Sequence, residues 1–150
     1  VLVSTDNDEI AAIAVSFGAD VPFLRDDHSG DHSPVSLAII ETLNKLKETE
    51  GKEYSKVVQL MANCPLRQAE DIVNAVNRFE EHNFSSQVSC FKFGWMNPWW
   101  AVQLDEKNKP SPLFPEAYGK RSQDLPDLFC PTGAIWMAET EAFLKAGSFY

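Results

Sequence analysis

The stretch Val-Leu-Val-Ser-Thr-Asp-Asn-Asp-Glu-Ile, residues 1–10, joins an apolar run directly to a predicted helix start. Val1 to Val3 is the kind of segment that forms a parallel strand when helices cover both faces of its sheet. Asp6 is the predicted N-cap of the helix, and Glu9, three residues later, would complete a capping box. Polar side chains that follow a parallel strand are typical of ligand sites in open α/β sheets. This strand end is therefore where we look for a nucleotide.

Strand and helix patterns alternate along the chain after this point. Strands are predicted at residues 20–24, 57–61, 87–93 and 133–138. Helices are predicted at 7–17, at 34–50, after the turn at 63–67, and from 139 to about 146. Residues 95–115, rich in Trp and Pro, predict a short hairpin or loop. Each crossover is long enough for a right-handed βαβ unit, with the strand at 57–61 in the centre of the sheet. We therefore expect an α/β fold, a three-layer αβα sandwich with a mostly parallel sheet.

Apolar residues at helical spacing mark the predicted buried face of each helix. These residues are Ile10, Ile13, Ala14 and Phe17 in the first helix, Leu37, Ile40, Leu43 and Leu46 in the second, and Ile72, Ala75, Val76 and Phe79 in the third. Glycine ends the first two helices, at Gly18 and Gly51.

Composition excludes several classes of function. A net charge of −9 argues against a nucleic-acid partner, because phosphate backbones need clustered Lys and Arg. No apolar run has the length of a membrane span, and no signal peptide is recognisable, so we expect no membrane partner. The three cysteines lack a C-x-x-C spacing, which favours reduced thiols and a cytoplasmic location over a zinc site.

The chain starts at Val1 rather than at an initiator Met, already within a predicted strand. We therefore expect residues 1–150 to form a single domain that is incomplete, as one piece of a larger protein or after removal of an upstream segment.

Three polar clusters follow predicted strands and would meet at one edge of a parallel sheet. They are Ser4 to Asp6, Arg25 with its following loop, and Asn63 to Arg67. Asp6 is either a helix cap or a ligand contact. Arg25 is either a solvated charge or a clamp on a base or phosphate.

Other candidates have an equally plain structural interpretation. His28 and His32 lie in a loop without a third ligand at fixed spacing, which favours surface histidines over a metal site. Arg121 and Gln123 alternate in a predicted extended segment, and either bind a carboxylate or hydroxyl as a pair or belong to a solvated connection. The tryptophans Trp95, Trp99 and Trp100 favour packing or a dimer contact over base stacking.

Six blocks in fixed order resemble the acylneuraminate cytidylyltransferases, which include the CMP-sialic acid synthetases. They are Val-Ser-Thr-Asp (3–6), Phe-Gly-Ala-x-Val (17–21), Leu-Arg (24–25), Cys-Pro-Leu-Arg (64–67), Arg-Ser-Gln-Asp-Leu-Pro (121–126) and Pro-Thr-Gly-Ala-Ile (131–135). The resemblance covers the whole chain. It implies a fold like that of nucleotide-diphospho-sugar transferases, a homodimer, Mg²⁺ as cofactor, and CTP and a keto-sugar acid as substrates.

The resemblance also implies roles for single residues. Arg25 would lie by the cytosine, with Ser33 or Ser36 as a second contact, and we add Asp6 to this nucleotide set from its place at the strand end. Arg121 and Gln123 would face the sugar acid, which Phe149 and Tyr150 would line. Met61 stands where sialate-specific members often carry a substrate-contacting Gln. Asn63 matches a metal-binding Asp of the related Kdo cytidylyltransferases.

Departures from the family pattern shape the expected function. The family's phosphate-binding loop and its Asp-Ile-Asp metal motif both lie outside residues 1–150. Met61 favours a pseudaminic- or legionaminic-type sugar acid over N-acetylneuraminate, Cys64 replaces a common Ser, and Thr132 a common Asn. We expect a nucleotidyltransferase that activates a nine-carbon keto-sugar acid with CTP. The alternatives are a truncated non-catalytic relative, acting as a nucleotide-binding or protein-association module, and a different nucleotidyl- or glycosyltransferase of the same fold.

Overall fold

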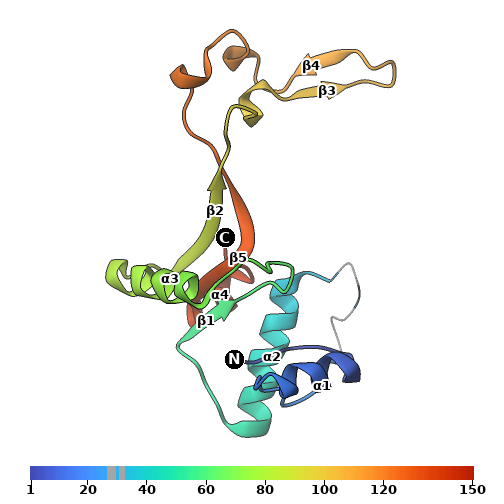
Figure 1. The fold of residues 1–150 in the computed structure, drawn as a ribbon, viewed down its shortest axis with the longest axis vertical. Coiled ribbons are helices and arrows are strands. Elements are labelled where there is room, and N and C mark those ends of the chain that lie inside the picture. Colours follow the sequence, from blue (N-terminus) through green and yellow to red (C-terminus); the bar gives the residue numbers. More distant parts are fainter. Residues whose placement is uncertain (27–29, 31–32) are drawn as a thin grey trace.

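The computed structural model of the chain describes residues 1–26, 30 and 33–150. His28 and His32 therefore lie outside the described residues. The helices are α1 (Asp8–Ser16), α2 (Val35–Glu50), α3 (Ala69–His82) and α4 (Thr140–Ala146), and the strands are β1 (Lys56–Gln59), β2 (Ser86–Lys92), β3 (Val102–Leu104), β4 (Pro110–Pro112) and β5 (Phe129–Glu139). Short 3₁₀ turns cover Pro98–Trp100, Pro115–Ala117 and Ser122–Asp124. Figure 1 shows their arrangement.

The main sheet is antiparallel, and the predicted three-layer sandwich with a mostly parallel sheet is wrong. Strand β5 lies between β1 and β2 and pairs antiparallel with both, in the order β1-β5-β2. Strand β1, predicted to be central, is therefore at an edge. The two outer strands run in the same direction, as a βαβ unit through α3 requires, but β5 has inserted between them. A late strand from residues 129–139 thus decides the direction of every pair in this sheet.

Alternate residues of β5 face opposite sides of the sheet, as the period of a strand requires. Ile135 and Met137 pack with Phe79 on the side of α3. Ala138 packs with Phe143 of α4 and with Phe149 on the other side, where Ile39, Ile40 and Leu43 of α2 join them. The predicted apolar face of α3 is therefore confirmed as core. On α2 the prediction holds for Ile40, Leu43 and Leu46, whereas Leu37 is exposed.

The N-terminal segment differs from its prediction. Residues 1–3 make a single parallel bridge, Leu2 to Asp20, and not a full strand. The N-cap of α1 is Asn7, whose side-chain oxygen accepts from the Ile10 amide at 3.0 Å. Asp6, predicted to be the cap, is exposed one residue earlier. Gly18 follows the helix with a φ of 82°, the left-handed conformation that glycine adopts without strain.

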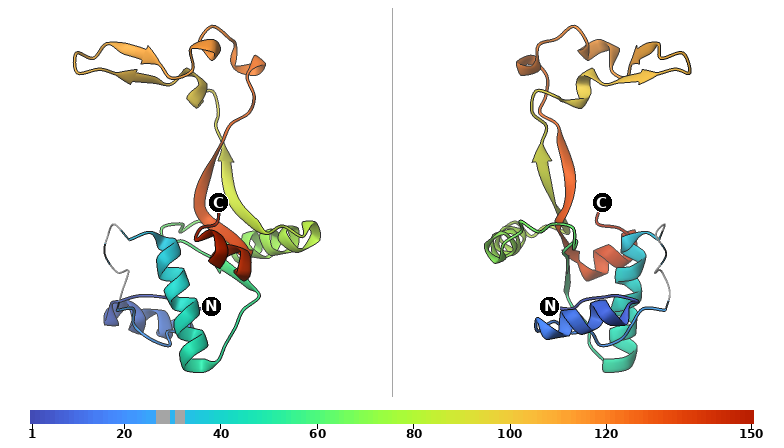
Figure 2. Two further views of the ribbon diagram at one scale, coloured as in Figure 1. Left: turned by 180° about the vertical axis from the view of Figure 1, so that it is seen from behind. Right: turned by 45° about the vertical axis from the view of Figure 1, so that its right-hand side comes forward.

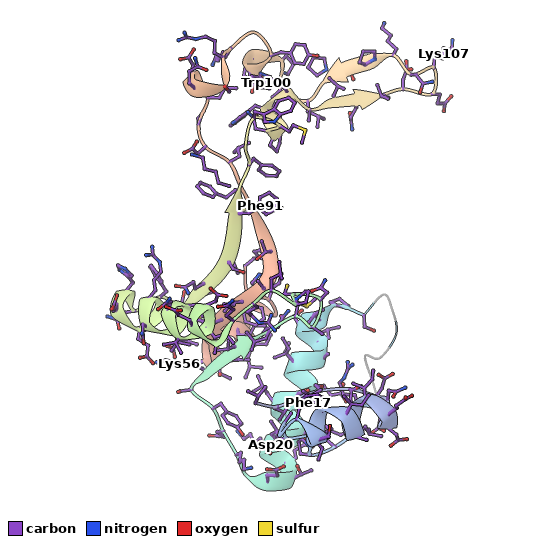
Figure 3. The ribbon with its side chains drawn as sticks, in the orientation of Figure 1. Phe17, Asp20, Lys56, Phe91, Trp100 and Lys107 are labelled. Atoms are coloured by element: carbon purple, nitrogen blue, oxygen red, sulfur yellow. The ribbon has the colours of Figure 1, made fainter. Side chains whose placement is uncertain are left out.

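Helix α1 leaves its apolar side exposed, contrary to the prediction of a buried face. The exposed fraction is 52% for Ile10, 53% for Ile13 and 88% for Phe17. Figure 3 shows Phe17 in the N-terminal part of the molecule, near α1 and α2. Periodicity identified the apolar side of the helix, but not whether another part of the described chain covers it.

An arm of residues 93–128 extends away from the helices and the sheet. It begins where the Phe93 amide donates to the Leu128 carbonyl at 3.0 Å, and it contains the predicted hairpin as β3 and β4. Figure 2 shows in two further views that the ribbon of β2 and β5 separates this arm from the four helices. Trp100 and Lys107 both lie on the arm (Figure 3).

Among the described residues, no helix is both long and apolar enough to cross a lipid bilayer.

Candidate functional site

A wide bulge interrupts the pairing of β2 with β5. Val88 pairs with Trp136 and Cys90 with Pro131, so Ser89 alone lies opposite residues 132–135. The Ser89 and Thr132 hydroxyl oxygens are 2.6 Å apart, and Ser89 Oγ accepts from the Ile135 amide at 3.0 Å. Bulges of this kind re-aim side chains and are frequent beside functional sites. The bulge contains most of the Pro-Thr-Gly-Ala-Ile block.

Arg67 joins this bulge to the loop that follows β1. Its Nη1 donates to the Met61 carbonyl at 2.9 Å and to the Ala134 carbonyl at 2.7 Å. No described residue accepts a hydrogen bond from Nε or Nη2 of this guanidinium. A charged donor that bonds two carbonyls fixes both segments more firmly than neutral pairs would. The Cys-Pro-Leu-Arg and Pro-Thr-Gly-Ala-Ile blocks, far apart in sequence, therefore form one structural unit.

Met61 contacts the bulge through Gly133. The Met61 amide donates to the Gly133 carbonyl at 3.2 Å. A Cβ atom added to Gly133 would lie 2.6 Å from Met61 Cγ, closer than any real contact. Glycine at this position thus lets the half-buried Met61 side chain pack directly on the bulge.

A cavity of about 520 Å³ opens beside this unit. Its lining consists of Cys64, Pro65, Leu66, Arg67, Asp71, Ser89, Ala134 and Ile135. The lining combines apolar walls with one charged donor, the usual composition of a small-molecule site. Asp71 is engaged elsewhere, because its Oδ2 accepts from the Gln68 amide at 2.8 Å and caps α3. The guanidinium can hold a carboxylate or phosphate oxygen here.

Asn63, the predicted metal ligand, is exposed, and its Oδ1 accepts from Cys64 Sγ at 3.6 Å. The described part of the chain contains no group of three or more His, Cys, Asp or Glu side chains that could hold a metal ion. Since Mg²⁺ prefers carboxylate oxygens, the described residues do not fit a Mg²⁺ site at Asn63.

The predicted nucleotide set lies in the N-terminal part. The Arg25 amide donates to the Thr5 carbonyl at 2.8 Å, so Arg25 lies against the Ser4–Asp6 cluster as expected. Its side chain is half-buried. Ser33 and Ser36 are half-buried on either side of the start of α2. Their contact with a nucleotide stays a prediction.

The aromatic pair at the end of the sequence splits into a buried and an exposed member. Phe149 is 3% exposed and packs on Phe143, with ring centroids 4.5 Å apart. Tyr150 is 70% exposed and meets the Trp136 ring edge-on at 5.2 Å. Of this pair, Tyr150 and not Phe149 is therefore the aromatic side chain that a ligand can contact from solvent.

Arg121 and Gln123 lie on the arm, not beside the cavity. Gln123 belongs to a 3₁₀ turn rather than to the predicted extended segment, and Arg121, whose backbone is extended, directly precedes that turn. Arg121 is exposed and forms an ion pair with Asp124, with nitrogen–oxygen distances of 2.7 and 3.0 Å. This hydrogen bonding raises the pKa of the Arg121 guanidinium. Figure 1 places this part of the arm at the opposite end of the β2–β5 ribbon from α1 and α2.

The structure thus unites Met61 with the bulge, and Arg25 with Ser4–Asp6, but leaves Arg121 and Gln123 apart from both within one chain. Sequence reasoning gave no role to Ser89 or Gly133. Gly133 could have been found only from its place in the Pro-Thr-Gly-Ala-Ile block. The residues around Ser89 give no such signal, because the role of Ser89 depends on the opposite strand.

A family model described as cytidylyltransferase matches residues 1–111. The chain is 26% identical to the pseudaminic acid cytidylyltransferase of Campylobacter jejuni over 145 residues, an alignment that covers 97% of this chain. It is 31% identical over 160 aligned positions to the CMP-N,N′-diacetyllegionaminic acid synthase of Legionella pneumophila, over 100% of this chain. It is 25% identical to the N-acylneuraminate cytidylyltransferase of Streptococcus agalactiae, also over 100% of this chain. The chain spans 62%, 64% and 35% of the length of these three relatives, respectively.

Proposed function

Because this chain belongs to the cytidylyltransferase family, we propose that it takes part in transferring a cytidylyl group from CTP to a nine-carbon keto-sugar acid. The products are a CMP-sugar and pyrophosphate. The observation that carries the proposal is the Arg67 clamp, because it brings two of the family's sequence blocks together around one cavity.

In the proposed reaction the anomeric hydroxyl oxygen of the sugar acid forms a bond to the α-phosphorus of CTP. The bond from that phosphorus to the bridging oxygen breaks, pyrophosphate leaves, and the hydroxyl loses its proton. Such transfers depend on positioning and on neutralising charge. Arg25 would hold the nucleotide, and Arg67 would hold an anionic oxygen at the cavity. The Mg²⁺ that the family resemblance implies is part of the proposal, but we derive no step through it.

For the sugar we propose a pseudaminic- or legionaminic-type acid. Met61 presents a thioether chain where sialate-specific members often present an amide, so this wall of the site favours apolar groups. The names of the Campylobacter and Legionella relatives agree with this choice. We also propose a cytoplasmic location, supported by three cysteines that are all unpaired.

We further propose that the working form is a homodimer built through the arm. The arm exposes apolar side chains, with Trp95 at 78%, Met96 at 73% and Leu104 at 61%. A second copy would cover this surface. If Arg121 and Met61 both face the sugar acid, as the resemblance implies, they belong to different copies, because one chain holds them apart.

The test is pyrophosphate release by the native protein with CTP, a pseudaminic- or legionaminic-type acid and Mg²⁺. We expect release with CTP and not with GTP or UTP. Release with GTP or UTP instead would favour a different transferase of the same family of folds. No release with any such sugar would contradict the proposal.

The exposed apolar arm also favours a second candidate, a non-catalytic module that acts through protein association. Binding of CTP, or self-association, without turnover of any sugar acid would support this candidate over the enzyme.

A further inference from the structure

Gln59 is a polar side chain buried at the end of β1. It is 8% exposed and pairs in register with Trp136 of β5. Strand alternation puts it on the same face as Val57, which packs with Ala138 and Phe149 in the core beneath α2 and α4. The carboxamide of Gln59 thus lies on the aromatic side of the sheet, next to the Trp136 indole.

Neither end of this carboxamide has a hydrogen-bond partner among the described residues. Nε2 and Oε1 of Gln59 are both covered and unpartnered, and so is Nε1 of Trp136. Gln87 of β2 is satisfied at one end only, since its Nε2 donates to the Ala75 carbonyl at 2.9 Å while its Oε1 is unpartnered. Buried polar groups are nearly always satisfied, so each exception needs an explanation.

The orphaned atoms have a defined complement. Gln59 offers one donor and one acceptor side by side, and Trp136 adds a donor. The carbonyl oxygen of a secondary amide has two lone pairs and can accept from both Gln59 Nε2 and Trp136 Nε1, while its N–H points the opposite way because the amide is trans. A hydroxyl oxygen is two bonds closer to the sugar carbon than this carbonyl oxygen, so it does not reach the two donors from the same position of the sugar.

The aromatic side chains next to Gln59 and Trp136 reach solvent at one end. Trp136 meets the Phe149 ring at 5.8 Å and the Tyr150 ring at 5.2 Å, and Tyr150 is the exposed one. A ligand reaches the pair by displacing some of these side chains, a side-chain movement that is common on binding. The flat aromatic walls would then hold the methyl end of an acyl group.

We propose that Gln59 determines sugar specificity by hydrogen-bonding an acylamino substituent of the keto-sugar acid. This inference rests on the proposed function, and it adds a residue and a substituent to it. Gln59 does not touch the reacting atoms, so its effect is on substrate choice and not on the chemical step.

The test uses the native protein and three nine-carbon keto-sugar acids. One carries two acetamido groups, and in each of the other two a hydroxyl replaces a different one of these groups. We expect the wild type to prefer the diacetamido acid over one of the two hydroxyl analogues. Gln59→Met keeps an unbranched chain without polar ends. It should lower kcat/KM for the diacetamido acid about 10-fold by raising KM, the effect of one lost hydrogen bond between neutral groups. Its kcat/KM for that hydroxyl analogue should stay the same.

Gln87→Met is the matched control, and it should leave the preference among these sugar acids unchanged. Gln59→Leu is the second variant. Both Gln59 variants should fold at least as stably as the wild type, because they remove orphaned polar atoms. An unchanged sugar preference in Gln59→Met and Gln59→Leu would overturn the inference while leaving the proposed function intact. A wild type that turns over none of these sugar acids would overturn both the inference and the proposed function.

Discussion

Replacing Arg67 with Met tests the clamp between the loop after β1 and the bulge of β5. The substitution keeps a long aliphatic chain and removes both hydrogen bonds, to the Met61 and Ala134 carbonyls at 2.9 and 2.7 Å. A hydrogen bond from a charged donor contributes roughly 1.5–3 kcal/mol. Both bonds are only part-buried, so water can replace the guanidinium at each carbonyl, and we use the lower figure for each. The expected loss of unfolding free energy is therefore about 3 kcal/mol.

Chemical denaturation of the chain, followed by circular dichroism, measures this loss. In a thermal scan the same loss should lower Tm by about 6–12 °C for a domain of this size. Arg78→Met is the matched control, because Arg78 is exposed on α3 and takes part in no ion pair with a described residue. The control should change stability by less than about 0.5 kcal/mol. A loss below about 1 kcal/mol for Arg67→Met would refute the clamp.

The remaining predictions concern the two substrates, the bulge and the arm. In steady-state kinetics, Arg121→Ala should raise KM for the sugar acid about 10- to 100-fold with little change in KM for CTP. Arg25→Ala should raise KM for CTP with little change in KM for the sugar acid. Equal effects of either variant on both substrates would contradict the assigned roles. Gly133→Ala should destabilise the chain by about 1–3 kcal/mol, because its Cβ would press on Met61 Cγ. Met61→Ala should relieve most of that loss in the double variant, and additive losses in denaturation would exclude the contact. Trp95→Ser should shift sedimentation toward the monomer if the arm is the dimer contact, and an unchanged sedimentation coefficient would argue against it.

The elements of the fold were predictable from local patterns, but the direction of the sheet was not. Helix periodicity located α2 and α3 and, apart from the exposed Leu37, their core residues. The Trp- and Pro-rich sequence of the arm predicted a hairpin or a loop, and the structure has the hairpin. The alternation of strand and helix gave a parallel sheet, because it recorded only the connection from β1 through α3 to β2. Pairing with β5 depends on contacts between residues about 40 to 80 positions apart, which no local pattern contains.

The residues of the candidate site were predictable from local sequence, but their contacts were not. The Cys-Pro-Leu-Arg and Pro-Thr-Gly-Ala-Ile blocks contain Arg67 and Gly133. The roles of these two residues depend on the bulge opposite Ser89, and a bulge is a property of a pair of strands. Asn7 took the cap assigned to Asp6, because both residue types cap equally well and only the backbone decides between neighbours. The exposed face of α1 shows the same limit, since periodicity identifies an apolar face and not its partner.

Transfer of label from CTP radiolabelled at the α-phosphate tests the central claim most directly. The native protein, incubated with this CTP, Mg²⁺ and a pseudaminic- or legionaminic-type acid, should place the label in a CMP-sugar and release unlabelled pyrophosphate. Label that stays in CTP with every nine-carbon keto-sugar acid, although the protein binds CTP, would contradict the account and favour a non-catalytic module.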